Sequence, residues 1–234
     1  MVDSDWCNGS LTRFVPGARF LDVTAGGAVE EVADALSSAP VVLLDGLGPL
    51  QGYVFEWLND SDFFRNLGEP VGLTYVVIVE EDKDSVFQAG EAVRALGDTG
   101  QWLVVRNLKT CPTTEIYNNS DARQQLLQCG AAEIQMDRVP WNLLLHIQRS
   151  GKTVGALAQD PALPFLERQR VKSYQAKFFE QLESAAHMLL PGPSHVPARP
   201  AVIQSAPAPP AAPAHSQQPS KQDPARPRVA PERV

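Results

Sequence analysis

Four short runs of apolar residues constrain the fold of this chain more than any other feature. They are Val41–Leu44, Leu73–Val79, Trp102–Val105 and Ala132–Met136. The first three consist almost entirely of valine, leucine, isoleucine and aromatic residues, without the polar alternation of a half-exposed strand. Runs of this kind are typical of strands that are covered on both faces of a parallel sheet. The sequence therefore predicts buried, parallel strands.

Helical patterns lie between these runs, at Val29–Leu36, Gly52–Leu67, Asp84–Leu96 and Asp121–Cys129. Asp84 is a candidate N-cap, and Gly130 follows the last pattern, where a glycine commonly ends a helix. Because strands and helices alternate along the chain, we predict an α/β fold with a doubly wound, mostly parallel sheet.

A longer amphipathic helix is predicted at about Leu163–Leu190. Its apolar stripe consists of Val171, Tyr174, Phe178, Leu182, Ala185 and Leu189. The simpler interpretation is that this stripe docks on the sheet of the same domain. The alternative is a dimer or partner surface, because Tyr174, Phe178 and Phe179 are large side chains of the kind that anchor interfaces.

Residues 191–234 have a different composition. They hold 12 of the 20 prolines and almost no large apolar residues. Too little apolar area can be buried here to offset chain entropy, so we expect a disordered Pro/Ala-rich tail after a domain at residues 1–190. The tail carries a net charge of +3, and residues 1–190 carry −10. An acidic body argues against direct sequence-specific binding of nucleic acid.

Composition also bears on location. The 3 cysteines, Cys7, Cys111 and Cys129, form no CxxC motif, so neither a disulfide framework nor a zinc site is expected. Asp3 and Asp5 stand where a signal peptide would be basic. No apolar run approaches the ~20 residues that span a membrane. We therefore expect a cytoplasmic protein without a membrane span.

Two segments place carboxylates where strands are expected to end. Asp3 and Asp5 follow an apolar residue in Val-Asp-Ser-Asp, and Asp45 follows Val41–Leu44 and precedes Gly46. In a parallel sheet, side chains at the carboxyl ends of strands face the ligand crevice. A carboxylate there can hold Mg²⁺, as in a Walker B strand. The simpler interpretations are a solvated chain end and an ordinary Asp-Gly turn.

Two further polar or turn residues follow the later strands. Asn107 ends the segment Gln-Trp-Leu-Val-Val-Arg-Asn, and its side chain has both the donor and the acceptor needed to read a purine edge. The alternative is an Asx-turn at a strand end. Pro140 lies between the last predicted strand and a predicted helix at Trp141–Arg149.

Taken in order, these segments resemble a known family. VDSDWCNGSLTRF, VVLLDGLG, WLVVRNLK and VPWN are similar to the successive motifs of the ParA/MinD group of deviant Walker ATPases, in the SIMIBI class of P-loop NTPases. The resemblance covers about residues 1–190 and points to plasmid-borne members of the TraL and StbB type, which are linked to conjugal transfer and plasmid stability. It implies that Asp3 and Asp5 lie near the catalytic water, that Asp45 binds magnesium, that Asn107 contacts adenine and that Pro140 packs on the base.

The resemblance also implies a first strand, a lysine- and glycine-rich phosphate loop and a first helix ahead of the Val-Asp-x-Asp strand. That strand begins here at Val2, and Gly151-Lys152-Thr153, which imitates the end of such a loop, follows a predicted helix. We therefore expect a chain that lacks this unit, through a truncated gene or a start codon placed too far downstream. ATP and Mg²⁺ are expected to bind weakly or not at all, and ATP hydrolysis is expected to be lost.

Two functions of different classes follow. One is a truncated ParA/MinD-like nucleotide-binding protein of plasmid transfer or maintenance, for which a second copy and conjugation or partition proteins are candidate partners. The other is a non-catalytic adaptor that binds a relaxosome or partition partner through the C-terminal helix and tail. A third class, a carrier-type enzyme of the dethiobiotin or cobyrinate synthase kind, has no substrate-binding constellation in its favour.

Overall fold

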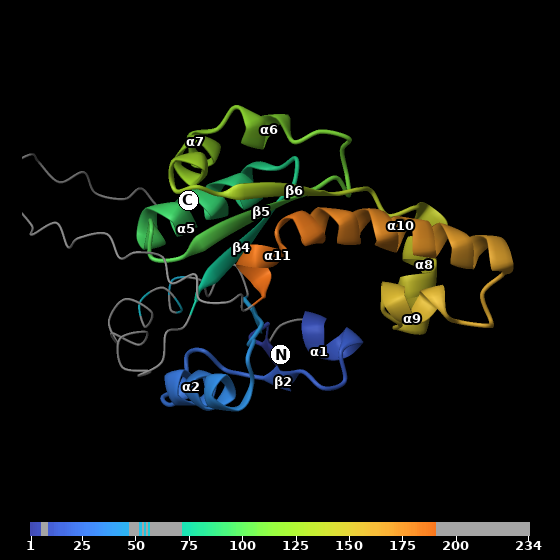
Figure 1. Ribbon diagram of the computed structural model, residues 1–234, viewed down its shortest axis with the longest axis horizontal. Coiled ribbons are helices and arrows are strands. Elements are labelled where there is room, and N and C mark those ends of the chain that lie inside the picture. Colours follow the sequence, from blue (N-terminus) through green and yellow to red (C-terminus); the bar gives the residue numbers. More distant parts are fainter. Residues whose placement is uncertain (6–8, 47–51, 53, 55, 57–71, 191–234) are drawn as a thin grey trace, which may run out of the picture. The chain divides into compact units, whose positions relative to one another are not determined.

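Each strand pairing that the structure describes is parallel, as the apolar runs predict (Figure 1). The structure is a computed structural model, and it describes residues 1–5, 9–46, 52, 54, 56 and 72–190. Contacts divide the chain into a unit at Met1–Val196 and a unit at Pro197–Val234, of which the second lies outside the described residues. The described strands form two three-stranded sheets.

The first sheet has the strand order β2-β1-β3. Its elements follow along the chain as β1 (Val2–Asp3), α1 (Ser10–Phe14), β2 (Arg19–Phe20), α2 (Ala28–Ser38) and β3 (Leu44–Asp45). Helices occupy the links because parallel neighbours need crossover connections. Val2, Leu21, Val23, Ala28 and Val32 form the buried cluster of this region, so α2 packs its apolar side against the strands.

The second sheet has the strand order β4-β5-β6. Its elements are β4 (Thr74–Val79), α5 (Lys83–Leu96), β5 (Gln101–Asn107), α6 (Glu115–Asn118), α7 (Asp121–Gln128) and β6 (Ala132–Met136). The register pairs Thr74 with Gln101 at the start of β4 and Asn107 with Met136 at the end of β5. The carboxyl ends of these strands therefore lie at one edge.

Four helices follow the second sheet. They are α8 (Trp141–Ser150), α9 (Val154–Ala158), α10 (Phe165–Ser184) and α11 (Ala186–Leu189). Residues of α8, α9 and the first half of α10 share one buried cluster around Leu143, Leu157 and Val171. The second half of α10 and α11 pack on β5 and β6 through Phe178, Leu182, Ala185 and Leu189. The predicted docking of this apolar stripe on the domain's own sheet is confirmed for these four residues, whereas Val171 and Tyr174 pack against α8 and α9.

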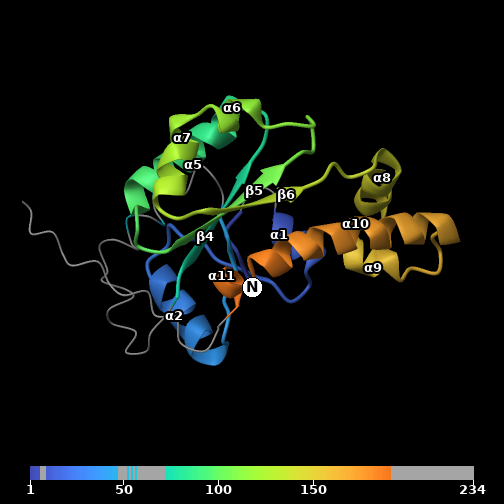
Figure 2. The ribbon, with the colours of Figure 1, turned by 45° about the horizontal axis from the view of Figure 1, so that its top comes forward.

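The middle strand, β5, is buried on both faces. Trp102 and Val104 join a cluster with residues of α5, α6 and α7, whereas Leu103 and Val105 join the cluster with α10 and α11 (Figure 2). All four side chains are at most 6% exposed. Successive side chains of a strand point to opposite faces, so helices have to cover both faces of β5.

Polar caps fix the ends of two helices. The Asp82 side chain accepts a hydrogen bond from Ser85 N at 2.7 Å, so the N-cap of α5 is Asp82 and not Asp84 as predicted. Ser120 caps α7 in the same way through Arg123 N at 3.1 Å. Gly130 follows α7 with a φ of 77°, a left-handed conformation that favours glycine.

Most predicted elements are confirmed to within two residues, with three corrections. The burial predicted for Leu73–Val79 on both faces is wrong, because Val76 and Ile78 of β4 are 43% and 57% exposed. The strand predicted at Val41–Leu44 is wrong, because β3 begins at Leu44, and Val41 and Leu43 are 45% and 49% exposed. The single long helix is also wrong, because Ala185 N donates to Leu182 O and ends α10 in a tight turn before α11. The helix predicted at Gly52–Leu67 lies, except for residues 52, 54 and 56, outside the described residues, as does the whole of 191–234.

Within the described part of the chain, no helix combines the length and the apolar character needed to cross a membrane.

Trp102 tests the importance of the middle strand. Its ring is fully buried, and its Nε1–H donates to Gly97 O at 2.7 Å. We expect Trp102→Phe to lower the free energy of unfolding by about 2–3 kcal/mol, because it leaves a cavity and an unpaired carbonyl group. Chemical denaturation followed by circular dichroism measures the change. The matched control is Trp141→Phe at a residue that is 65% exposed, where a change within about 0.5 kcal/mol is expected.

Candidate functional site

Asp3 and Asp45 stand side by side at the carboxyl ends of β1 and β3. The two strands are parallel, and their register pairs Val2 with Leu44 and Asp3 with Asp45. Ser4 strengthens this junction, because its N–H and its hydroxyl both donate to the carbonyl oxygen of Asp45, at 3.0 and 2.8 Å. Ser4 is 1% exposed, and a serine between two aspartates gives no sequence signal for this role.

The Asp3 side chain is fully buried and holds the chain that follows it. Its Oδ1 accepts a hydrogen bond from Asp5 N at 2.9 Å, and its Oδ2 accepts one from Thr12 N of α1 at 2.8 Å. Burial acts to raise the pKa of Asp3, but the N–H donors of Thr12 and Asp5 outweigh it and hold that pKa below its ordinary value. Ionised Asp3 therefore fixes the position of α1 against β1.

The Asp45 carboxylate has the opposite environment. It accepts no hydrogen bond from any residue that the structure describes. Burial raises the pKa of Asp45, and the negative charges of Asp3 and Asp5 raise it further. Asp5 is only 7% exposed, so solvent screens its effect on Asp45 little. The site thus concentrates negative charge around one carboxylate whose oxygen atoms accept no hydrogen bond from residues 1–5, 9–46 and 72–190.

Mg²⁺, the metal that the sequence resemblance implies, fits these residues in part. Magnesium sites commonly use one or two carboxylates and complete the shell with water and substrate phosphates. Asp45 matches that requirement, because its carboxylate lies near the negative charges of Asp3 and Asp5 and accepts no hydrogen bond from the described part of the chain. Among residues 1–5, 9–46 and 72–190, no group of three or more His, Cys, Asp or Glu side chains could hold a metal ion by itself. Asp45 would therefore supply one ligand to an ion held mainly by water or phosphate.

Asn107 lies at the end of β5, in the second sheet. Its Nδ2 donates to Glu80 Oε1 at 2.7 Å, and its Oδ1 accepts from Lys109 N at 3.2 Å. The second bond is the Asx-turn that the sequence leaves open as an alternative to base recognition. Asn107 is 8% exposed, so its amide joins the ends of β4 and β5. Sequence reasoning missed Glu80, although an acidic residue directly after an apolar strand is a usable signal.

Pro140 and the Gly-Lys-Thr segment lie at helix ends. Pro140 is exposed and occupies the N-cap position of α8. Gly151 ends α8 with a φ of 63°, and Thr153 caps the short helix α9 through Ala156 N at 3.2 Å. Lys152 Nζ donates to Asp160 Oδ2 at 2.6 Å. This segment is a link between two helices, as the sequence predicts, and is not the strand-to-helix turn of a phosphate loop.

A second polar cluster, around Glu133 of β6, is built for stability. Arg123 donates to both carboxylate oxygens of Glu133, at 2.9 and 3.2 Å, and the Tyr117 hydroxyl donates to one of them at 3.0 Å. Burial raises the pKa of Tyr117, and the charge of Glu133 adds to this effect. Tyr117 is fully buried, and the partly exposed side chains of Arg123 and Glu133 are paired with each other. Sequence reasoning did not identify this cluster.

Comparison of the chain with protein-family models, with curated proteins and with solved structures found no match in any of the three. The structure itself shows an α/β chain with two small parallel sheets, an arrangement compatible with a Rossmann-like fold. Its sites therefore have to be interpreted from their own geometry.

Asp3 and Asp45 should respond in opposite ways to the loss of their charge. Ionised Asp45 opposes folding, because its raised pKa favours the protonated form in the folded state. We expect Asp45→Asn to raise Tm at pH 7, and the gain to vanish as pH falls below the ordinary carboxyl pKa of 3.8. Asp3→Asn should instead cost about 1.5–3 kcal/mol at pH 7, because it removes a charge that accepts two N–H bonds.

Thermal melts at several pH values measure both effects. The stabilisation due to ionised Asp3 is present above pH 3.8 and is lost as pH falls through its lowered pKa. The two variants should therefore converge toward the wild type at low pH from opposite sides. Equal and same-signed shifts at pH 7 would show that the two carboxylates do not differ as described.

Proposed function

We propose that this chain is a ParA/MinD-like nucleotide-binding protein of plasmid transfer or maintenance. In this proposal, Asp45 faces the magnesium ion of a bound nucleotide. The observation that carries it is the available Asp45 carboxylate at the carboxyl end of a parallel strand, beside the fixed carboxylate of Asp3. The order of motifs along the sequence supports the family, and the parallel α/β architecture is compatible with it.

Asp3 and Asp45 would have different roles in this site. Asp3 has each oxygen committed to a backbone N–H group, so it orients the strand end and adds negative charge. The oxygens of Asp45 accept no hydrogen bond from the residues that the structure describes, so Asp45 is proposed as the ligand of the cation. Bound Mg²⁺ would neutralise charge on nucleotide phosphates, which is its usual contribution to phosphoryl transfer.

Nucleotide affinity of residues 1–234 is proposed to be low. No lysine- and glycine-rich phosphate loop occurs in their sequence, and preorganised donors around the phosphates supply most of the catalysis in such enzymes. Asn107 would contact a base only through the amide N–H and the lone pair that its bonds to Glu80 and Lys109 leave over. We therefore propose weak binding without meaningful ATP hydrolysis.

A non-catalytic adaptor is the second candidate. It is favoured by Phe165, Leu166 and Phe179 of α10, which are between 50% and 68% exposed. Of the three large residues that the sequence offered as partner anchors, Tyr174 and Phe178 are packed inward, and Phe179 is exposed. An adaptor surface on α10 would therefore use Phe179 of the predicted anchors, together with Phe165 and Leu166.

Magnesium binding provides the direct test of the proposed site. Mg²⁺ at ten times its Kd adds about 1.4 kcal/mol of stability, which corresponds to a rise of about 3–6 °C in Tm for a chain of this size. We expect this rise for the wild type and its loss in Asp45→Asn. The control is Asp34→Asn, which removes one exposed carboxylate from α2 and should keep the response. An equal response of all three proteins would refute a role for Asp45.

A further inference from the structure

Charge is distributed very unevenly along this chain. Residues 1–137 contain 21 acidic and 8 basic residues, whereas residues 138–190 contain 4 acidic and 7 basic residues. The first stretch therefore has a net charge of −13 and the second a net charge of +3. The positively charged stretch of one copy can therefore attract the negatively charged stretch of a second copy.

The positive charge of the second stretch lies beside exposed apolar side chains on α10. We call Phe165, Leu166, Lys172, Lys177 and Phe179 the basic face. Phe165, Leu166 and Phe179 are 64%, 68% and 50% exposed. Both lysines are exposed, and neither forms an ion pair with a residue that the structure describes.

Helix geometry places the basic face on one side of α10. At 100° per residue, Phe165, Leu166, Lys172 and Phe179 are turned away from Val171, Tyr174 and Phe178, which pack inward, and Lys177 lies at the border between the two sides. Glu180 and Glu183 lie on the same side at the C-terminal end of the helix, so the positive charge is confined to the first two thirds of α10. The face thus combines large apolar side chains with two lysines, of which Lys177 has Glu180 three residues away without an ion pair between them.

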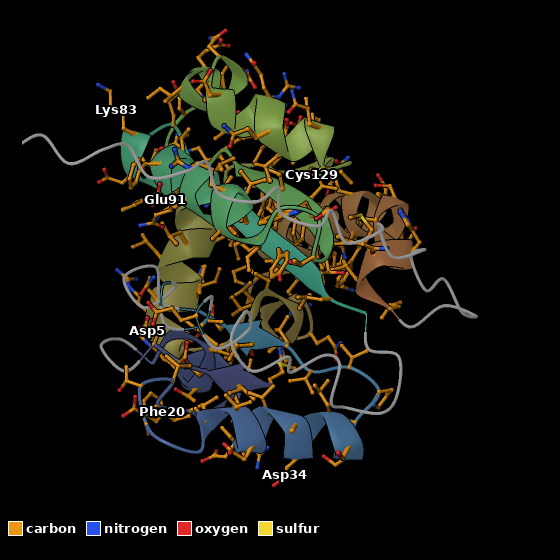
Figure 3. All side chains as sticks on the ribbon, turned by 90° about the vertical axis from the view of Figure 1, so that its left-hand side faces the viewer. Asp5, Phe20, Asp34, Lys83, Glu91 and Cys129 are labelled. Carbon is orange, nitrogen blue, oxygen red and sulfur yellow. The ribbon has the colours of Figure 1, made fainter. Side chains whose placement is uncertain are left out.

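A complementary surface lies on α2. We call Phe20, Glu30, Glu31 and Asp34 the acidic face. The three carboxylate residues are exposed, and α2 contains no basic residue. Phe20 is 50% exposed and lines the same shallow hollow as Glu31, with Arg19 as the cation at its edge. Figure 3 shows Asp34 on the outer side of α2 and Phe20 beside that helix.

We propose that the basic face of one copy docks on the acidic face of a second copy. The basic face carries three exposed apolar side chains and the acidic face carries one, each beside charges that are mainly of one sign, so contact would bury apolar area and pair opposite charges. Exposed ion pairs contribute modestly and are screened by salt, so this association is weak and salt-dependent. Because the faces are unlike, two copies either close a reciprocal dimer or extend into an open chain.

Sedimentation of the full chain without nucleotide tests the proposal. At about 50 mM NaCl we expect the weight-average mass to exceed the 25.4 kDa of one copy and to rise with protein concentration. At about 500 mM NaCl it should return toward one copy, because the shorter Debye length screens the attraction. A single copy under both conditions, across the concentration range, would overturn the proposal.

Charge reversal identifies the faces. Lys172→Glu/Lys177→Glu makes both faces acidic, and Glu30→Lys/Glu31→Lys/Asp34→Lys makes both basic, so each variant alone should associate at least about tenfold more weakly. An equal mixture of the two variants should associate again. Lys83→Glu/Lys109→Glu makes the same charge change at exposed residues outside both faces and should behave as the wild type. Failure of the mixture to associate would overturn the assignment of the faces.

Two controls separate this contact from other causes of association. Circular dichroism melts establish that the variants are folded before their masses are compared. Nuclease treatment before sedimentation tests a polyanion as the occupant of the basic face. Association that disappears with nuclease would assign the face to nucleic acid and overturn the contact between copies.

Discussion

Parallel strand pairing governs the fold and the candidate site together. Parallel neighbours need crossover connections, so helices lie between the strands of both sheets and cover the two faces of β5. The same pairing brings carboxyl ends to a common edge. Asp3 and Asp45 meet for this reason although 41 residues separate them, and Asn107 meets Glu80 at the end of the second sheet for the same reason.

The carboxylates of the first sheet acquire different roles from their hydrogen bonds. Asp3 lies where the chain turns back, so the N–H groups of Asp5 and Thr12 converge on it and favour its ionised form. Asp45 is followed by no such turn among the described residues, and it lies beside two negative charges. One carboxylate therefore stabilises the fold, and the other accepts no hydrogen bond from the residues that the structure describes. That contrast is the physical basis for assigning a cation to Asp45 and a supporting role to Asp3.

The sequence predicted the strand positions of the second sheet well, because β4 and β5 are largely continuous apolar runs and the helix α7 is followed by a clear stop signal, Gly130. It predicted the first sheet poorly, because strands of two residues carry no periodicity, and Val41 and Leu43 are apolar without being covered. It identified Asp3, Asp45 and Asn107 as strand-end residues. It did not identify their partners Ser4, Thr12 and Glu80, because hydrogen bonds between distant segments depend on register, which residue patterns do not reveal.

The difference between Asp3 and Asp45 is measured most directly by nuclear magnetic resonance titration of their side-chain carboxyl carbons. The account predicts that Asp3 titrates below the ordinary value of 3.8 and Asp45 above it. It also predicts that Mg²⁺ lowers the apparent pKa of Asp45 much more than that of Asp3, because a bound cation favours the ionised form of its own ligand. Coincident titration of the two groups, or no effect of Mg²⁺ on Asp45, would contradict the account.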